Sequence, residues 1–254
     1  MPGAMATRLS KAWIIPEWPA PERVRAVSTT RAGGVSRPPY ASLNLAAHVG
    51  DDAGAVAANR LHLGRALRLP LMPAWLQQVH GTQVVDAAGV DTPVMADAAY
   101  ALGPGVVCAV LTADCLPVLL CDRGGRAVAA AHAGWRGLAA GVIEQTVAAL
   151  PVPGGELMAW LGPAIGAQAY VVGEEVRAAF VTHDPAAAAA FRPAVAGGWH
   201  ADMYQLARQR LRSRGVSAVY GGGFCTFEDP VRFYSYRREG VTGRMATLIW
   251  LQDI

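Results

Sequence analysis

Three apolar segments in the middle of the chain constrain its fold more than any other feature. They are GVVCAVLTAD, PVLLCD and RAVAAAHAG, which begin at residues 105, 117 and 126. They are so rich in Val, Leu and Ala that no alternating polar face is left, which is typical of strands covered on both sides. The second and third segments flank a Gly-Gly turn. The sequence therefore predicts a hairpin inside a layered core.

Helices are expected on either side of these strands. Acidic residues open the segment 51–70 and Pro70 closes it, which indicates a helix. Three further helices are predicted at 135–150, 173–181 and 201–215, and the Ala-rich segment 185–193 predicts a surface helix or a variable insertion. Residues 232–251 predict a strand, a turn and a final buried strand. Because hairpins dominate the centre, we expect an α+β fold, a single domain with mixed or antiparallel β-sheets flanked by helices.

The length and charge of the chain limit the classes of protein it can represent. Its 254 residues are compatible with one large domain, which we place at residues 11–254 after a flexible tail at 1–10. The net charge of +3 and the lack of a long basic run do not favour a nucleic-acid partner. We see no signal peptide and no apolar run of about 18 residues, so we expect no membrane partner and a cytoplasmic location. Three of the four cysteines lie in apolar segments, which indicates reduced thiols.

A cysteine and a histidine lie at equal distances from the Gly-Gly turn. A two-residue loop at Arg123 and Gly124 would pair residues whose numbers add to 247, as Cys115 and His132 do. Direct cross-strand neighbours have Cβ atoms about 4.5–5.5 Å apart. Such a pair suits two ligands of one metal ion, or a thiol and its base.

A catalytic zinc site usually needs a third protein ligand. His80 is the best candidate among the six histidines, because the glycine after it in QVHG allows the backbone to turn tightly. Together His80, Cys115 and His132 form a mixed nitrogen and sulfur set, which suits zinc, with copper possible, rather than magnesium or calcium. A buried cysteine is often only a small apolar residue, so spacing alone leaves a core role open for this trio.

Several motifs, in one order along the chain, resemble those of the YfiH-like family. TADCLPVLL, HAGWRG and QVHG carry the resemblance, and TTRAGGVS, SLNL, MADA, GPAIG, FYSYRREG and TGRMATLIWL extend it over most of the chain. Members of this family are described as multicopper polyphenol oxidases (laccases) or as purine nucleoside phosphorylases. The resemblance implies one YfiH-like catalytic domain at 11–254, with His80, Cys115 and His132 as its metal ligands.

The resemblance also implies a reaction. It is phosphorolysis of adenosine, inosine and methylthioadenosine to base plus (methylthio)ribose 1-phosphate, together with hydrolytic deamination of adenosine to inosine. Zinc suits deamination because it lowers the pKa of coordinated water to about 7. A carboxylate must still move protons, and Asp114 and Asp97 are the catalytic candidates. One position departs from the family, since Val171 stands where a glutamate is usual.

Phosphorolysis requires donors for phosphate beside a site for the nucleoside. HAGWRG enters a predicted helix, whose N-terminus offers free N–H groups to an anion. Arginines could complete a phosphate clamp, amides could bind ligand or satisfy the backbone, and a tyrosine could stack on a base or pack in the core. These substrate-binding and phosphate-binding candidates are Arg31, Asn44, Gln78, Arg136, Tyr234 and Arg237.

Three other functions remain open from the sequence. A laccase-like polyphenol oxidase needs many histidines, often as H-x-H pairs, and this chain has no such pair. A Cys-His hydrolase would use Cys115 as thiolate and His132 as base. A third possibility, editing of peptidoglycan precursors, rests on the family resemblance alone.

Overall fold

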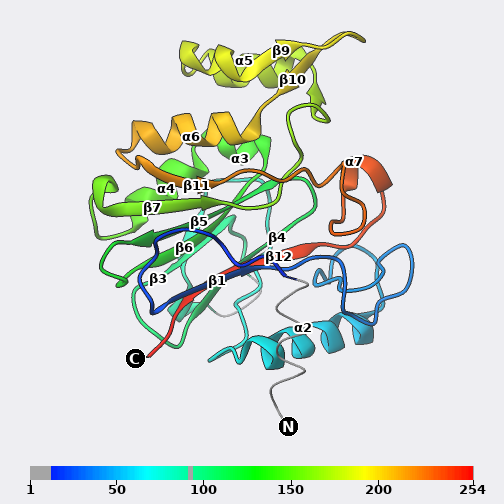
Figure 1. Cartoon of the computed structure of the whole chain (residues 1–254), viewed down its shortest axis with the longest axis vertical. Helices are drawn as coiled ribbons and strands as arrows, with labels where there is room; N and C mark the ends of the chain where they lie inside the picture. The colour runs from blue at the N-terminus through cyan, green and yellow to red at the C-terminus, as the bar shows by residue number, and fades with distance from the viewer. Residues whose placement is uncertain (1–12, 91–93, 254) are drawn as a thin grey trace.

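Two sheets packed face to face form the centre of the molecule, and a small third sheet lies apart from them (Figure 1). The computed structural model describes residues 13–90 and 94–253. The six-stranded sheet has the order β11-β7-β5-β6-β3-β2, and the two three-stranded sheets have the orders β1-β12-β4 and β8-β10-β9. The strands are β1 Val24–Ser28, β2 Val84–Asp86, β3 Ala98–Ala101, β4 Val107–Thr112, β5 Leu116–Asp122, β6 Val128–Ala133, β7 Leu157–Leu161, β8 Val171–Val172, β9 Phe191–Pro193, β10 Trp199–Ala201, β11 Ala218–Gly221 and β12 Met245–Leu251.

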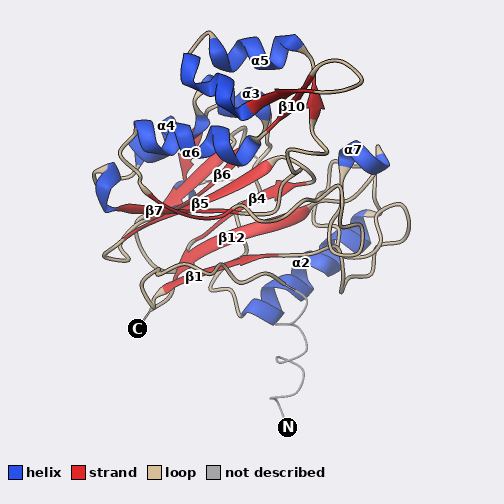
Figure 2. Cartoon of the chain, turned by 45° about the horizontal axis from the view of Figure 1, so that its top comes forward, coloured by secondary structure: helices blue, strands red, loops and turns tan. Residues whose placement is uncertain are grey.

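Helices cover the two outer faces of this pair of sheets (Figure 2). Helix α2 lies against the β1-β12-β4 sheet, and α3, α4 and α6 lie against the six-stranded sheet. The helices are α2 Ala53–Leu67, α3 Trp135–Ala140, α4 Val142–Ala149, α5 Glu174–Val181, α6 Met203–Ser213 and α7 Tyr236–Glu239, with short 3-10 helices at Ala87–Gly89, Gly154–Glu156 and Pro185–Ala190.

The three apolar segments form β4, β5 and β6, and every residue in these strands is buried. Sheet packs on sheet through residues such as Cys108, Leu119 and Ile249, while helices cover the far faces. Antiparallel pairs predominate, with parallel pairs at β2–β3 and β7–β11. The predicted α+β class with mixed and antiparallel sheets is therefore confirmed.

Three predicted elements differ in the structure. The helix predicted at 135–150 is two helices, because Gly141 has φ 101°, a left-handed conformation that ends α3 and precedes α4. The Ala-rich segment forms a 3-10 helix and then β9. The strand predicted at the start of 232–251 is a loop leading into the four-residue helix α7, and only the final strand, β12, is as expected.

The register of the β5–β6 hairpin also differs from the prediction. Pro117, not Cys115, lies opposite His132, and Cys121 lies opposite Val128. The turn is wider than two residues because the buried carboxylate of Asp122 accepts backbone N–H groups from residues 124, 126 and 127. The predicted direct pairing of Cys115 with His132 was thus wrong by two residues, a shift that keeps side chains on the same face of the sheet.

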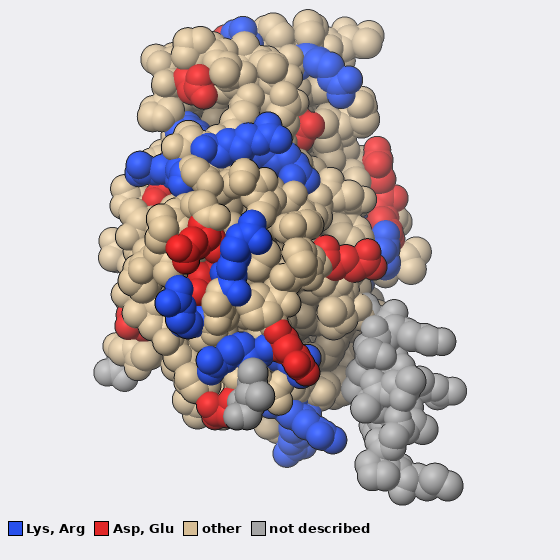
Figure 3. All heavy atoms as spheres, turned by 60° about the vertical axis from the view of Figure 1, so that its left-hand side comes forward, with Lys and Arg blue, Asp and Glu red and all other residues tan. Residues whose placement is uncertain are grey.

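The surface and the chain ends complete the description. On the face in Figure 3, basic side chains form separate groups with acidic side chains between them. Among the described residues, no helix has the length and apolar character needed to cross a membrane. The tail predicted at 1–10 lies outside the described residues.

Candidate metal centre

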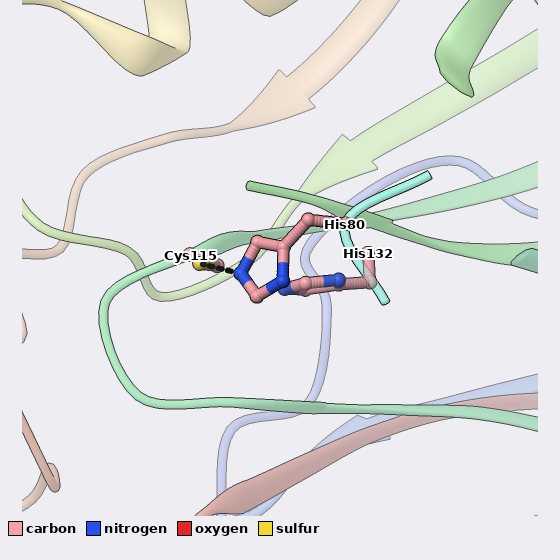
Figure 4. A group of neighbouring side chains, drawn as sticks. All are labelled: His80, Cys115 and His132. Atoms are coloured by element: carbon pink, nitrogen blue, oxygen red, sulfur yellow. Dashed lines mark hydrogen bonds between the residues drawn. The ribbon is translucent and has the colours of Figure 1, made fainter. Parts of the chain in front are cut away.

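The three predicted ligands converge at one end of β5 and β6, the central strands of the six-stranded sheet (Figure 4). Cys115 immediately precedes β5 and His132 is near the end of β6, so the antiparallel pairing brings both to the same end of this strand pair. His80 reaches them from the loop before β2. The ligand atoms of all three lie within 4.8 Å of one another, and Cys115 Sγ is 3.8 Å from His80 Nε2. The chain is therefore able to bind a metal ion here.

The backbone at His80 has an unusual conformation. Its φ is 60°, in the left-handed region, which costs a non-glycine residue about 1–2 kcal/mol. The carboxylate of Asp97 accepts the backbone N–H groups of Val79, His80 and Gly81 at 3.2, 2.9 and 2.7 Å. These charge-assisted bonds stabilise the tight turn. The sequence predicted that Gly81 would allow this turn, but His80 itself adopts the left-handed conformation.

The same carboxylate orients the second histidine. His132 Nδ1 lies 2.8 Å from Asp97 Oδ1, and both side chains are buried. Burial alone would raise the pKa of Asp97, but hydrogen bonds from His132 and the backbone outweigh it and lower that pKa. An ionised carboxylate only accepts, so His132 donates from Nδ1 and presents Nε2 to Cys115 and His80. This carboxylate–histidine arrangement is common behind metal ligands.

Without a metal ion, the cysteine and the buried histidine form an ion pair. Burial opposes ionisation of Cys115, but the charge of His132 and hydrogen bonds from both histidines lower the pKa of the thiol to about 6. Burial likewise opposes the charged form of His132, but the Cys115 thiolate and Asp97 raise the pKa of the imidazole to about 9. The thiolate is the form that ligates metals.

The donor set and its spacing fit zinc or another borderline metal. Tetrahedral ligands at about 2.0–2.3 Å from zinc lie roughly 3.3–3.8 Å from each other. The contact of 3.8 Å between Cys115 and His80 already matches, and the widest separation of 4.8 Å would close by about 1 Å. Three ligands leave a coordination position for water or substrate.

A pocket of about 220 Å³ opens beside the trio. Arg136 lines it and stacks on the ring of Trp135, 4.4 Å from the ring centroid, with its guanidinium exposed. Arg237 also lines it and donates from its guanidinium to the Val171 carbonyl at 2.9 Å. Val171, the position at which the motifs depart from the family resemblance, thus contacts Arg237 through its backbone.

Asp114 lines this pocket but its carboxylate is already engaged. It accepts from the hydroxyl of Thr226 at 2.6 Å and from the backbone N–H of Arg237 at 2.7 Å. Its φ of 95° is left-handed, which is rare for a non-glycine residue. Through these bonds the carboxylate holds the segment around α7 next to Cys115 and the start of β5.

Four other candidates lie outside the pocket wall, and each has structural partners. Gln78 exchanges two hydrogen bonds with the backbone of Leu111. Asn44 is buried and bonds residues 46, 51 and 244. Arg31 pairs with Glu239 at 2.7 Å and lies over the buried ring of Tyr234, whose hydroxyl donates to the Tyr40 carbonyl. Their roles as ligand-binding groups stay predictions.

Sequence reasoning missed several side chains of the pocket wall. Tyr170 and Tyr236 supply two aromatic rings, and Ile165 and Met203 supply apolar contacts. Tyr236 is 60% exposed and Tyr234 is fully buried, although both lie in FYSYRREG. The motif indicated a site, but only the fold shows which tyrosine faces it.

Comparison with known proteins places this geometry in a family. Residues 25–252 match the family model described as multi-copper polyphenol oxidoreductase laccase. The chain belongs to this family. It is 59% identical to a Pseudomonas aeruginosa protein named purine nucleoside phosphorylase, over 95% of this chain and 99% of the relative. It is 54% identical to the Escherichia coli purine nucleoside phosphorylase YfiH, over 94% and 98% of the two chains.

Solved structures have the same fold. A Neisseria meningitidis protein that is 52% identical has a TM-score of 0.93, with 95% of this chain and 100% of the other covered. YlmD from Geobacillus stearothermophilus, at 31% identity, has a TM-score of 0.89 over 95% and 97% of the two chains. The resemblance to YfiH-like proteins drawn from the motifs is confirmed.

Proposed function

We propose that this protein is a zinc-dependent purine nucleoside phosphorylase that also deaminates adenosine to inosine. The convergence of His80, Cys115 and His132 beside a pocket lined by two arginines carries the proposal. The names of the relatives support phosphorolysis of purine nucleosides. Adenosine, inosine and methylthioadenosine are the proposed substrates, with phosphate as the second.

The residues around the pocket divide this work. A zinc ion held by the trio would supply a Lewis acid for the reaction. Arg136 is exposed and its guanidinium stacks on Trp135 without a hydrogen bond or ion pair to any of the described residues, so its donors are free to bind phosphate. The rings of Tyr170 and Tyr236 offer aromatic surface to a purine. Asp97 and Asp114 support the site through their hydrogen bonds, and proton transfer by either carboxylate stays a prediction.

The decisive experiment combines metal analysis with a product assay. Protein purified without chelator is analysed for zinc and copper, then incubated with adenosine in the presence and absence of phosphate. We expect adenine and ribose 1-phosphate with phosphate, and inosine without it. Robust oxidation of a phenol with no purine turnover in metal-replete protein would instead favour the polyphenol oxidase.

The His80→Ala variant tests whether the site is catalytic. Because His80 is exposed on a loop, we expect its loss to remove zinc and turnover while leaving the fold intact. Global unfolding of this variant would indicate a structural zinc site instead.

One observation favours a second candidate, a Cys-His hydrolase. Asp97, His132 and Cys115 form a carboxylate–imidazole–thiolate series like that of thiol hydrolases. The two candidates respond differently to inhibitors. A chelator abolishes activity of a metal enzyme, whereas a thiol enzyme survives the chelator and is inactivated by an alkylating agent.

A further inference from the structure

A second cavity, of about 540 Å³, is lined in part by Gln77 and Gln78, which shortly precede His80 in the chain. His48, Arg60, Trp75 and Gln77 contribute polar and aromatic groups to its wall. Its volume is in the range of small-molecule pockets, and larger than that of the pocket beside the trio. We call it the Arg60 cavity.

The guanidinium of Arg60 is fixed but not fully used. It lies over the ring of Trp75, 4.4 Å from the centroid, and its Nε donates to the Leu45 carbonyl at 2.9 Å. Its two terminal nitrogens bond no other group within residues 13–90 and 94–253. A guanidinium held flat with free terminal donors is arranged to bind two oxygens of an anion.

Arg60 is the one charged side chain among the described residues that line this cavity. The described residues that line it include no aspartate or glutamate. The pKa of the His48 imidazole is lowered, mainly by partial burial and further by the positive charges of Arg244 and Arg60. The imidazole is therefore neutral at physiological pH and adds a hydrogen-bond donor and an acceptor.

The rest of the wall suits a planar ring. Trp75, Leu76 and Leu111 supply aromatic and aliphatic surface, and the amide of Gln77 is exposed. Gln78 fastens the floor of the cavity through its paired hydrogen bonds of 2.8 and 2.7 Å with the Leu111 backbone. The residues that line this cavity and those that line the pocket beside the trio are different, although Gln78 precedes His80 by only two residues.

We propose that the Arg60 cavity binds an anionic nucleotide of the nucleoside monophosphate class. The phosphate group binds the terminal nitrogens of Arg60, and the base lies against Trp75 and the aliphatic wall, with its polar edge toward Gln77. This site is separate from the metal centre and goes beyond the phosphorylase function, whose proposed nucleoside substrates carry no phosphate.

Calorimetric titration of the zinc-loaded full chain tests this assignment, with AMP, adenosine and inorganic phosphate as probes. Loss of a charge-assisted pair of hydrogen bonds weakens binding by about ten- to a hundredfold, so Arg60→Ala should weaken AMP binding by that amount. Arg65→Ala is the matched control, because Arg65 lies on the same helix and is exposed outside the cavity. It should bind AMP as the wild type does.

Two further variants keep the test decisive. His48→Ala removes an exposed side chain and should also weaken AMP binding even if Arg60→Ala folds poorly. Cys115→Ala removes the metal centre and should leave AMP binding intact. Absence of AMP binding, loss of it in Cys115→Ala alone, or equal Arg60 dependence for adenosine and AMP would each overturn the proposal. Phosphorolysis is assayed separately, so its failure is distinguishable from failure of this site.

Discussion

The substitution Asp97→Asn separates support of the metal centre from proton transfer. The side chain is fully buried and accepts four hydrogen bonds, three from backbone N–H groups and one from His132 Nδ1. Asparagine has the same shape but only one acceptor oxygen, and it turns N–H donors toward other donors. Both histidine ligands thus lose part of their support together.

The expected effects follow from these contacts. Outer groups that orient metal ligands are worth about 10–100-fold in metal affinity, so zinc affinity should fall by that factor. Hydrogen bonds to buried charged groups are worth about 1.5–3 kcal/mol each, and we expect the free energy of unfolding to fall by about 2–4 kcal/mol in total. Competition with a chromogenic chelator measures the first quantity, and urea unfolding of the metal-free protein measures the second.

Asp122→Asn is the matched control. Asp122 is also fully buried and accepts backbone N–H groups, but it lies at the opposite end of β5 from Cys115. This variant should lose stability and keep its zinc affinity. If Asp97→Asn bound zinc as tightly as the control does, Asp97 would not support the ligands. If it kept zinc but lost all turnover, Asp97 would be the proton-transfer residue predicted from the sequence.

Three further perturbations test other parts of the site. Arg136→Ala should lower kcat/KM for phosphorolysis by about ten- to a hundredfold and affect deamination less, whereas equal losses would mean that Arg136 positions the nucleoside. Gly134→Ala should abolish zinc binding at little cost in stability, as measured by metal analysis and unfolding, because its Cβ would lie 2.7 Å from the His80 ring and 3.1 Å from Cys115 Sγ. Metal-free protein should react with iodoacetamide at Cys115 at a rate that rises as pH passes about 6, since the lowered pKa leaves the thiolate present above that pH. Added zinc should suppress this reaction, and a rise only near pH 8.5, the ordinary range of a free thiol, would contradict the ion pair.

The layered core was predictable because burial on both faces leaves a simple mark on the sequence. Strands β4, β5 and β6 are apolar throughout and are buried throughout. The hairpin register was not predictable from the Gly-Gly pair, since the turn is set by the Asp122 carboxylate and three N–H groups. The break at Gly141 was missed because glycine within a helical pattern is tolerated as well as terminating.

Prediction of the site divides along similar lines. The trio was found because Cys and His ligands lie in motifs whose order resembles a known family. The roles of the polar residues proposed beside the trio were harder to predict. The residue type is the same whether a buried amide bonds the backbone or binds a ligand. Gln78 and Asn44 bond backbone groups, and Tyr234 lies under Arg31 in the core. Tyr170 and Tyr236 reach the pocket through long-range packing that no local pattern encodes.

The two acidic residues predicted for catalysis support opposite sides of one site, and their catalytic roles stay predictions. Asp97 fixes the loop of His80 and the ring of His132, and Asp114 fixes the α7 segment beside Cys115. Asp114 precedes Cys115 in the chain, so its hydrogen bond to Arg237 connects Cys115 to helix α7. Loss of this bond should therefore change the position of Cys115 relative to the pocket. The Asp97 carboxylate accepts four hydrogen bonds, whereas the Asp114 carboxylate accepts two and lines the pocket, so Asp114 keeps acceptor positions that a proton could use. Asp114 and the exposed Tyr236 both line the pocket, so substitution of each, Asp114→Asn and Tyr236→Phe, tests which one moves protons in the proposed reactions.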